Sequence, residues 1–389
     1  MKSYNGLWDQ MMTTENIIES IEHAHEGKGK KLKKKHYRLL VKFYKHRYEE
    51  ETQNTVRRWI YETANVYNPN WYRPPIEIKD GPSGKIRKIY VPTVKELIVQ
   101  HCVVNVLKKI LLPMLGSQVY GSIPGKGSQK AVRKMMEFIR EHPEQCKYCV
   151  KMDHKKYFDS IPQQKLMHKL QKKIRDDKFY CLLCIIIMYI PNMKGLPIGF
   201  YTSQLLGVWY LYDSDEYVNN TLKHEGVSYF TRWMDDVYFF GPDKRDLEKC
   251  MRKYTAYTRI HQDLHIKDNW QCFRFSYRDS EGNYHGRFLD CMGYRVYCDR
   301  VVLRESIMFN MIKKANRIGR ARHITIGQCK SMLSYNGYLK VTKTYNVYLK
   351  FIKPKISFKY LRKRVSAYDR RINGMENRSR DSGQKARAA

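Results

Sequence analysis

The stretch FTRWMDDVYFFG at residues 230–241 decides the fold of this chain. Apolar residues flank the adjacent Asp235 and Asp236, a pattern that predicts two strands joined by a tight turn carrying both carboxylates. Two neighbouring carboxylates repel each other and are costly to remove from water. A divalent cation offsets both costs, because hard cations such as Mg²⁺ take carboxylate oxygens as ligands. A polar hairpin tip without any ligand is the alternative interpretation.

Another acidic position lies nearer the N-terminus, in VKMDHKKYFDSIP at residues 150–162. Asp153 follows a short apolar run there, which predicts a strand with a carboxylate at its end. Beside the Asp235–Asp236 pair, this acid would complete a set of three ligands for two metal ions. Two-metal sites clamp the attacking and leaving oxygens of in-line phosphoryl transfer. Such a triad in a basic chain therefore suggests nucleotidyl transfer on a nucleic acid.

The chain is strongly basic, with 73 lysines and arginines against 38 acidic residues in 389 positions and a formal net charge of +35. This charge predicts a polyanionic partner, either nucleic acid or an anionic membrane surface. The longest apolar run, at 181–190, is shorter than the roughly 20 residues that span a bilayer, and no apolar leader opens the sequence. We expect a cytoplasmic protein with reduced cysteines and no membrane partner.

Hydrophobic periodicity predicts an α+β fold in which helices alternate with short strands. The segment 76–92 reads as a β-hairpin, because two alternating runs flank a turn rich in glycine and proline. Further strands are predicted at 148–152, 264–277 and 286–303, and helices at 4–26, 93–115, 163–190, 202–222 and 243–261.

Two segments concentrate the positive charge. Residues 28–58 hold twelve lysines and arginines against three glutamates, a density that favours nucleic-acid contact over a solvated face. Residues 304–389 hold 22 lysines and arginines against four acids, and apolar residues recur there with helical spacing. We therefore expect a basic helical subdomain at the C-terminal end. Its last residues are poor in apolar side chains and are expected to be disordered.

Seven blocks in order along the chain resemble the motifs of reverse transcriptases. They read KIRKIYVP (85–92), YGSIPGKGSQKAV (120–132), KMDHKKYFDSI (151–161), GLPIGFYTSQ (195–204), RWMDDVYFF (232–240), LHIKDNWQ (264–271) and FLDCMGYRVY (288–297). The resemblance implies a right-hand polymerase architecture with fingers, palm and helical thumb. It divides the chain into an N-terminal helical basic region (1–75), fingers (76–147), palm (148–300), thumb (301–372) and a disordered tail (373–389).

The resemblance also implies roles for the acids and for an aromatic residue after them. Asp153 and Asp235 would bind two Mg²⁺ ions, or Mn²⁺ in their place, with Asp236 in support. Phe158 lies five residues after Asp153 and matches the family's bulky steric gate, which rejects a ribose 2′-hydroxyl and so favours dNTPs. Taken alone, Phe158 would be interpreted as a core aromatic.

Three cations match positions that handle the triphosphate in this family. Lys85 and Arg87 lie on the fingers hairpin and would grip the incoming nucleotide, with Arg87 suited to bidentate phosphate contact. Lys267 matches a lysine that is a candidate general acid for the pyrophosphate leaving group. The alternative for all three is an ordinary solvated charge.

The block at 195–204 indicates a subclass. Many relatives carry Gln where this chain has Ile198, which precedes Gly199 and is followed by Thr-Ser-Gln ending at Gln204. This pattern resembles the enzymes of diversity-generating retroelements, which copy a template RNA and err mainly opposite adenine. A β-branched apolar side chain cannot donate the hydrogen bonds of an amide, so base selection would rest more on pairing strength. The alternative is that Ile198 simply packs.

The resemblance implies as partners a template RNA, the RNA–cDNA hybrid, dNTPs and a small basic helical-bundle accessory protein, in a bacterial or phage-encoded system. A defence-associated reverse transcriptase that makes cDNA from a dedicated noncoding RNA is a second hypothesis with the same catalytic residues. A third is an inactive RNA-binding relative of the polymerases.

Overall fold

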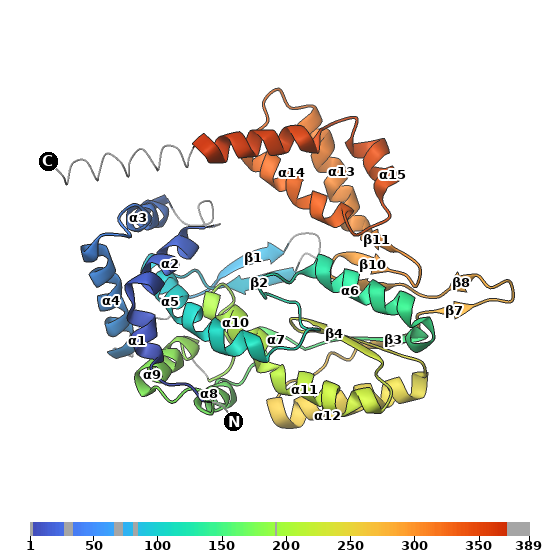
Figure 1. Ribbon diagram of the computed structural model, residues 1–389, viewed down its shortest axis with the longest axis horizontal. Helices are drawn as coiled ribbons and strands as arrows, with labels where there is room; N and C mark the ends of the chain where they lie inside the picture. Colours follow the sequence, from blue (N-terminus) through green and yellow to red (C-terminus); the bar gives the residue numbers. More distant parts are fainter. Residues whose placement is uncertain (1–2, 27–33, 66–72, 81–84, 191–192, 372–389) are drawn as a thin grey trace. The chain divides into compact units, whose positions relative to one another are not determined.

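Helices and antiparallel strands alternate along the chain, which confirms the predicted α+β class (Figure 1). A computed structural model describes residues 3–26, 34–65, 73–80, 85–190 and 193–371. The chain divides into two compact units: the first comprises residues 1–127 and 148–273, and the second comprises 128–147 and 274–389. The division into fingers, palm and thumb stays a prediction, and the predicted tail at 373–389 lies outside the described residues.

A four-stranded sheet forms the centre of the first unit, with the strand order β4-β5-β3-β6. Its strands are β3 (Tyr148–Asp153), β4 (Tyr229–Trp233), β5 (Asp236–Gly241) and β6 (Gln271–Arg274). Strand β5 pairs antiparallel with both β4 and β3. The strands predicted at 148–152 and across 230–241 are therefore confirmed.

One face of this sheet is covered by helices. Val150 and Met152 on β3, with Val237 and Phe239 on β5, are buried in one cluster with residues of the helices α11 (Tyr212–Asn220) and α12 (Lys244–Gln262). Successive side chains of a strand point to opposite faces. The alternate positions on these strands, including Asp153 and Asp236, therefore lie on the face away from this cluster.

A long helix, α5 (Val94–Leu111), forms the core of the N-terminal part of the first unit. It begins with a capping box, in which Thr93 and Glu96 satisfy each other's backbone N–H groups. The helices that contact α5 are α1 (Leu7–Met12), α2 (Thr14–His25), α3 (Lys34–Lys45), α4 (Glu50–Asn65) and α10 (Tyr201–Tyr210). The helix predicted at 93–115 is thereby confirmed.

Within the described residues, one stretch is long and apolar enough to cross a membrane, and it is α5 with the short η2 helix (Leu112–Met114) after it. Its most apolar window is 72% buried. The surrounding helices therefore account for its apolar character, as they do for the core helix of any globular protein.

The predicted hairpin at 76–92 is present as β1 (Ile76–Asp80) and β2 (Lys85–Ile89). The strands pair antiparallel, with Ile76 opposite Ile89 and Ile78 opposite Arg87. The turn at 81–84 lies outside the described residues.

Three predicted helices prove to be pairs of helices. The single helix expected over 4–26 is wrong, because Thr13 is extended and its side chain caps α2 by accepting from the Asn16 N–H. The helix expected over 163–190 splits into α8 (Gln163–Gln171) and α9 (Asp177–Ile187), since Asp176 caps the second. The helix expected over 202–222 splits at Leu211 into α10 and α11.

The second unit combines short strands with helices, and its C-terminal helices share a small core. Its helices are α6 (Ser128–Glu141), η3 (Pro143–Cys146), α13 (Glu305–Gly319), α14 (Ile326–Leu339), α15 (Tyr345–Val347), the π-helical η5 (Tyr348–Ile352) and a helix at 358–371. Its strands are β7 (Tyr277–Arg278), β8 (Tyr284–His285), β9 (Leu289–Cys291), β10 (Tyr294–Val296) and β11 (Val301–Leu303). The predicted helical character of the C-terminal region is confirmed for the part that the structure describes.

Candidate catalytic site

The antiparallel register brings the three predicted acids together. Asp153, the last residue of β3, lies directly opposite Asp236, the first residue of β5. Asp235 precedes Asp236 in the tight turn that joins β4 to β5, where Trp233 pairs with Asp236. Two segments about 80 residues apart in sequence thus present three carboxyl groups at one edge of the sheet.

The carboxyl groups of Asp235 and Asp236 are in an environment that disfavours their negative charge. Burial, followed by the charges of Asp236 and Asp153, raises the pKa of Asp235 to about 7. Burial and the charge of Asp153 raise the pKa of Asp236 to about 6. The cluster therefore holds more negative charge near neutral pH than its surroundings stabilise, and it favours a proton or another cation.

Lys267 supplies one cation to this cluster. Its ammonium forms an ion pair with Asp153 Oδ2, and its backbone N–H donates to the Asp153 carbonyl at 2.9 Å. The other carboxylate oxygen, Asp153 Oδ1, is buried without a hydrogen-bond partner. The sequence indicated both residues, and the structure places them in contact.

The donor chemistry of the cluster suits a divalent cation, since hard cations take carboxylate oxygens and Asp153 Oδ1 has no partner. Nevertheless, within the described part of the chain no three Asp, Glu, His or Cys side chains are grouped closely enough to hold a metal ion. The ammonium of Lys267 lies against Asp153 in this arrangement, so loading a metal requires that side chain to withdraw. The metal roles of the acids stay predictions.

A buried ion pair fixes the turn that carries Asp235, and the motif comparison missed it. The guanidinium of Arg232 on β4 bonds both carboxylate oxygens of Asp215 on α11, at 2.7 and 2.5 Å. It also donates to the Met234 carbonyl at 2.8 Å. Arg232 and Asp215 are 0% and 1% exposed. The sequence did hold a signal, because strand alternation places this arginine on the same face as the core residue Phe230.

Two further contacts hold the same turn. The Nδ1 atom of His154 lies 3.0 Å from the carbonyl oxygen of Asp235. Because a carbonyl only accepts, Nδ1 carries the proton, and burial lowers the pKa of His154 to about 4, which keeps the ring neutral. On the other side, a Cβ at Gly121 would lie 2.6 Å from the Met234 nitrogen, so only glycine allows this approach. Met234 itself has a left-handed φ of 55°.

The predicted steric gate, Phe158, lies on the short helix α7 (Tyr157–Ser160) and is partly buried. Its ring packs against α10 at Gly207, where a Cβ would lie 2.9 Å from Phe158 Cε1. The glycine therefore makes room for the aromatic ring. The gate role stays a prediction.

The predicted nucleotide-binding residues of the 195–204 block meet the end of the hairpin. The Ile198 carbonyl accepts from the Tyr90 N–H at 2.7 Å. Gly199 has a φ of +113°, and a Cβ there would lie 2.2 Å from the Tyr90 carbonyl oxygen, so this position requires glycine. The structure gives neither Ile198 nor Gly199 a contact with the three acids.

The remaining predicted residues are exposed or only partly described. Arg87 is exposed on β2, and Gln204 is exposed on α10. Lys85 is the first residue of β2, and its side chain lies outside the part of the chain that the structure describes. Their roles toward the triphosphate stay predictions.

Comparison with known proteins supports the interpretation of this site. Residues 78–269 match the family model described as reverse transcriptase (RNA-dependent DNA polymerase). The chain is 29% identical over 154 residues to the "Uncharacterized 91 kDa protein in cob intron" of Schizosaccharomyces pombe, which covers 38% of this chain and 18% of that protein. It is 26% identical over 152 residues to the "Putative COX1/OXI3 intron 2 protein" of Saccharomyces cerevisiae, which covers 37% and 17%.

The chain thus spans less than a fifth of the length of these two relatives. Among solved structures, the apo telomerase of Candida tropicalis truncated from its C-terminal domain aligns with a TM-score of 0.42 and 13% identity, over 69% of this chain and 68% of that one. The matched family segment runs from the β1–β2 hairpin to beyond Lys267 and includes all three acids. Residues 78–269 of this chain are therefore a reverse transcriptase domain.

Proposed function

We propose that this chain is an RNA-directed DNA polymerase that copies a template RNA into cDNA. The observation that carries the proposal is the placement of Asp153 opposite Asp236, with Asp235 beside it, inside a reverse transcriptase domain. Its substrates would be dNTPs and a template RNA, and its product an RNA–cDNA hybrid.

The reaction that such a site supports is nucleotidyl transfer. The 3′-hydroxyl of the primer gives its proton to solvent, and its oxygen bonds to the α-phosphorus of a dNTP. The bond between that phosphorus and the oxygen bridging to the β-phosphorus breaks, and pyrophosphate leaves. Two Mg²⁺ ions held by the acids would stabilise charge on the attacking and leaving oxygens. Lys267, which contacts Asp153, would protonate the departing pyrophosphate.

Replacement of Asp235 by asparagine tests the proposal. We expect Asp235→Asn to lower primer extension on an RNA template by about a thousandfold or more, because an amide does not replace the charge that holds a metal ion. The measurement is single-nucleotide extension of a labelled DNA primer, with Asp177→Asn, an exposed acid on α9, as the matched control. Equal rates for Asp235→Asn and the control would overturn the proposal.

We further infer that the enzyme is error-prone opposite adenine, as in diversity-generating retroelements. The support is Ile198, which presents a hydrocarbon side chain, only half-buried, where many relatives carry an amide. Without an amide donor, the enzyme discriminates less between correct and incorrect base pairs, because the difference in their binding free energies is smaller.

The fidelity inference is tested by restoring the amide. We expect Ile198→Gln to reduce misincorporation opposite template adenine several-fold relative to the other template bases. Ile198→Val, which keeps a β-branched hydrocarbon, should leave the error spectrum unchanged. The measurement is deep sequencing of cDNA made on a defined RNA. Errors spread evenly over the four template bases would refute the adenine role and favour the defence-type enzyme, while leaving the polymerase activity intact.

A further inference from the structure

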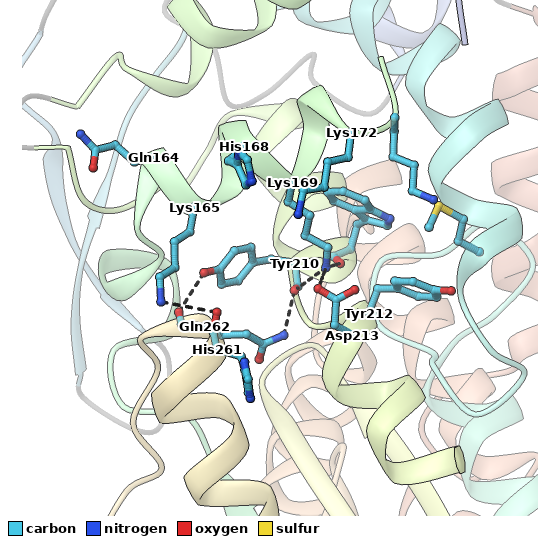
Figure 2. A pocket seen from close by; sticks show the side chains of 13 residues that line it. Gln164, Lys165, His168, Lys169, Lys172, Tyr210, Tyr212, Asp213, His261 and Gln262 are labelled. Carbon is cyan, nitrogen blue, oxygen red and sulfur yellow. Dashed lines mark hydrogen bonds and ion pairs between the residues drawn. The ribbon is translucent and has the colours of Figure 1, made fainter. Parts of the chain in front are cut away.

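A second candidate site lies in the first unit and shares no residue with the catalytic site. It is a pocket of about 670 Å³ lined by α8, the turn after it, the junction of α10 with α11, and the end of α12 (Figure 2). None of its lining residues belongs to the central sheet or to the blocks that carry the acids.

The lining of this pocket is strongly basic. Lys165, Lys169 and Lys172 follow one another at helical spacing along α8 and its C-cap, and Lys173 comes next. Like charges spaced three and four residues apart on a helix destabilise it. These lysines therefore do not stabilise α8 itself, and negative charge from another part of the protein or from a ligand is needed to offset their repulsion.

The protein itself neutralises two of these four lysines. Lys169 forms an ion pair with Asp213 at 2.9 Å and donates to the carbonyls of Trp209 and Tyr210 at 3.3 and 3.0 Å. Lys165 pairs with Asp263 at 3.0 Å. Figure 2 shows Lys169 beside Tyr210 and Asp213, with their interactions as dashed lines. These two lysines are committed to the fold.

The other two lysines have no such partner. Lys172 and Lys173 form no ion pair with any residue in the described ranges, and both line the pocket. Lys172 is exposed, and Lys173 is half-buried. His168, exposed on the same helix, adds a donor beside them. The pocket thus presents two unneutralised ammonium groups to solvent.

We propose that this pocket binds the phosphate backbone of single-stranded RNA. A volume of about 670 Å³ exceeds what one phosphate needs and suits a nucleotide-sized unit. The indole of Trp209 is 0% exposed and the ring of Tyr210 is 2% exposed, so bases cannot stack on them. Tyr212, which also lines the pocket, is only half-buried and could stack on a base of any kind. Recognition therefore comes mainly from charge, without base selection, as expected for contacts that position a nucleic acid rather than identify it.

The proposal goes beyond template copying and does not depend on it. Since the pocket shares no residue with the acidic cluster, RNA held there would be a segment other than the one being copied. The pocket would then act as an anchor that keeps the RNA on the enzyme between cycles of nucleotide addition.

The test is RNA binding by a variant that lacks only the two unpaired lysines. We expect the full chain carrying Lys172→Gln and Lys173→Gln to bind a labelled 30-nucleotide single-stranded RNA several-fold more weakly at 0.1 M salt. The slope of log K against log[salt] should fall by about 1.4, which is 0.7 for each lost contact to a single strand. The measurement is fluorescence anisotropy without dNTPs.

A matched control removes the same charge elsewhere. Lys223 and Lys249 are exposed in the same unit and do not line the pocket, so Lys223→Gln with Lys249→Gln should retain nearly the original affinity and slope. Wild-type affinity in the pocket variant, or an equal loss in both variants, would overturn the proposal. Circular dichroism melting confirms that each variant is folded.

A second measurement needs no variant. Acetylation of lysines in the wild-type chain, read by mass spectrometry, should be reduced at Lys172 and Lys173 when the same RNA is present. Unchanged labelling would overturn the proposal, and so would equal protection by polyglutamate, which would point to an acidic protein partner. Because Asp235→Asn should show the same protection, failure of the polymerase proposal and failure of this one give different results.

Discussion

The side chains of Asp235 and Asp236 illustrate how a reactive site lowers the stability of the protein that carries it. Their carboxyl pKa values are raised from an ordinary value of 3.8 to about 7 and about 6, first by burial and then by neighbouring acids. Between about pH 4 and pH 7 the folded chain therefore holds protons that the unfolded chain has released. Their contribution to the free energy of unfolding falls as pH rises through this window, and the loss is complete above it.

Removing one of these charges should stabilise the protein at high pH. We expect Asp236→Asn to raise the free energy of unfolding by about 1–3 kcal/mol at pH 8, where the acid is ionised, and by much less at pH 5, where it is protonated. The measurement is thermal unfolding in a chelator at both values, with Asp177→Asn as the control. A stabilisation that is equal at pH 5 and pH 8, or a loss of stability at pH 8, would contradict the account.

At the residue scale, sequence chemistry identified the acids but not the contacts that hold them. Two adjacent carboxylates between apolar residues repel each other and are costly to bury, which indicates a functional role. Asp235 and Asp236 could therefore be recognised from a single stretch of sequence. The carbonyl of Met234 and the orphan oxygen of Asp153 carry no such signal, because their environment is made by segments distant in sequence.

At the scale of elements, the link between α11 and the β4–β5 hairpin matters most for the site. The pair of Arg232 and Asp215 joins them inside the core and reaches the turn through the Met234 carbonyl. Removing one partner of a buried ion pair leaves an uncompensated charge, which typically lowers the free energy of unfolding by about 3–5 kcal/mol. We therefore assign this pair a positioning role toward the acids.

This role predicts a specific kinetic pattern. Asp215→Asn should lower kcat of primer extension by about tenfold or more and weaken the apparent affinity for Mg²⁺, while KM for the template–primer stays near the original value. The measurement is a magnesium titration of extension rate at a temperature where the variant is folded. Glu216→Gln, on the same helix, is the control. A loss that is the same at all magnesium concentrations would indicate a purely structural effect.

Elements were predictable where a local pattern is strong. The hairpin at 76–92 and the strands around Asp235 follow from alternation, and both are present. The breaks at Thr13 and Leu211 were not predicted, because the apolar spacing continues across them. Thr13 is a good capping residue, yet only the packed structure shows that α2 begins there.

At the scale of the whole molecule, the net charge of +35 sets the character of nucleic-acid binding. We expect affinity for RNA to fall by at least about tenfold when salt rises from 50 to 200 mM. Binding releases counterions from the RNA phosphates, and this release is less favourable at higher salt. The measurement is anisotropy with an RNA of fixed sequence and a second RNA of shuffled sequence. An affinity that is independent of salt would contradict a binding mode dominated by charge.

The grouping of segments into units was beyond the reach of local patterns. Residues 128–147 belong to the second unit, although the motif at 120–132 begins in the first, so the boundary falls inside that motif. This assignment depends on contacts such as Gln129 with Gly337, more than 200 positions away in the sequence.

This grouping has a practical consequence for anyone who wishes to shorten the protein. The polypeptide passes from one unit to the other at 127–128, 147–148 and 273–274, so a single cut cannot separate them. A fragment ending at residue 273 would keep α6 without the body on which it packs. Its apolar stripe of Ala131, Val132, Met135, Met136 and Ile139 would then face water. Such a truncation should aggregate during expression. A version that also replaces residues 128–147 with a short flexible linker should remain soluble.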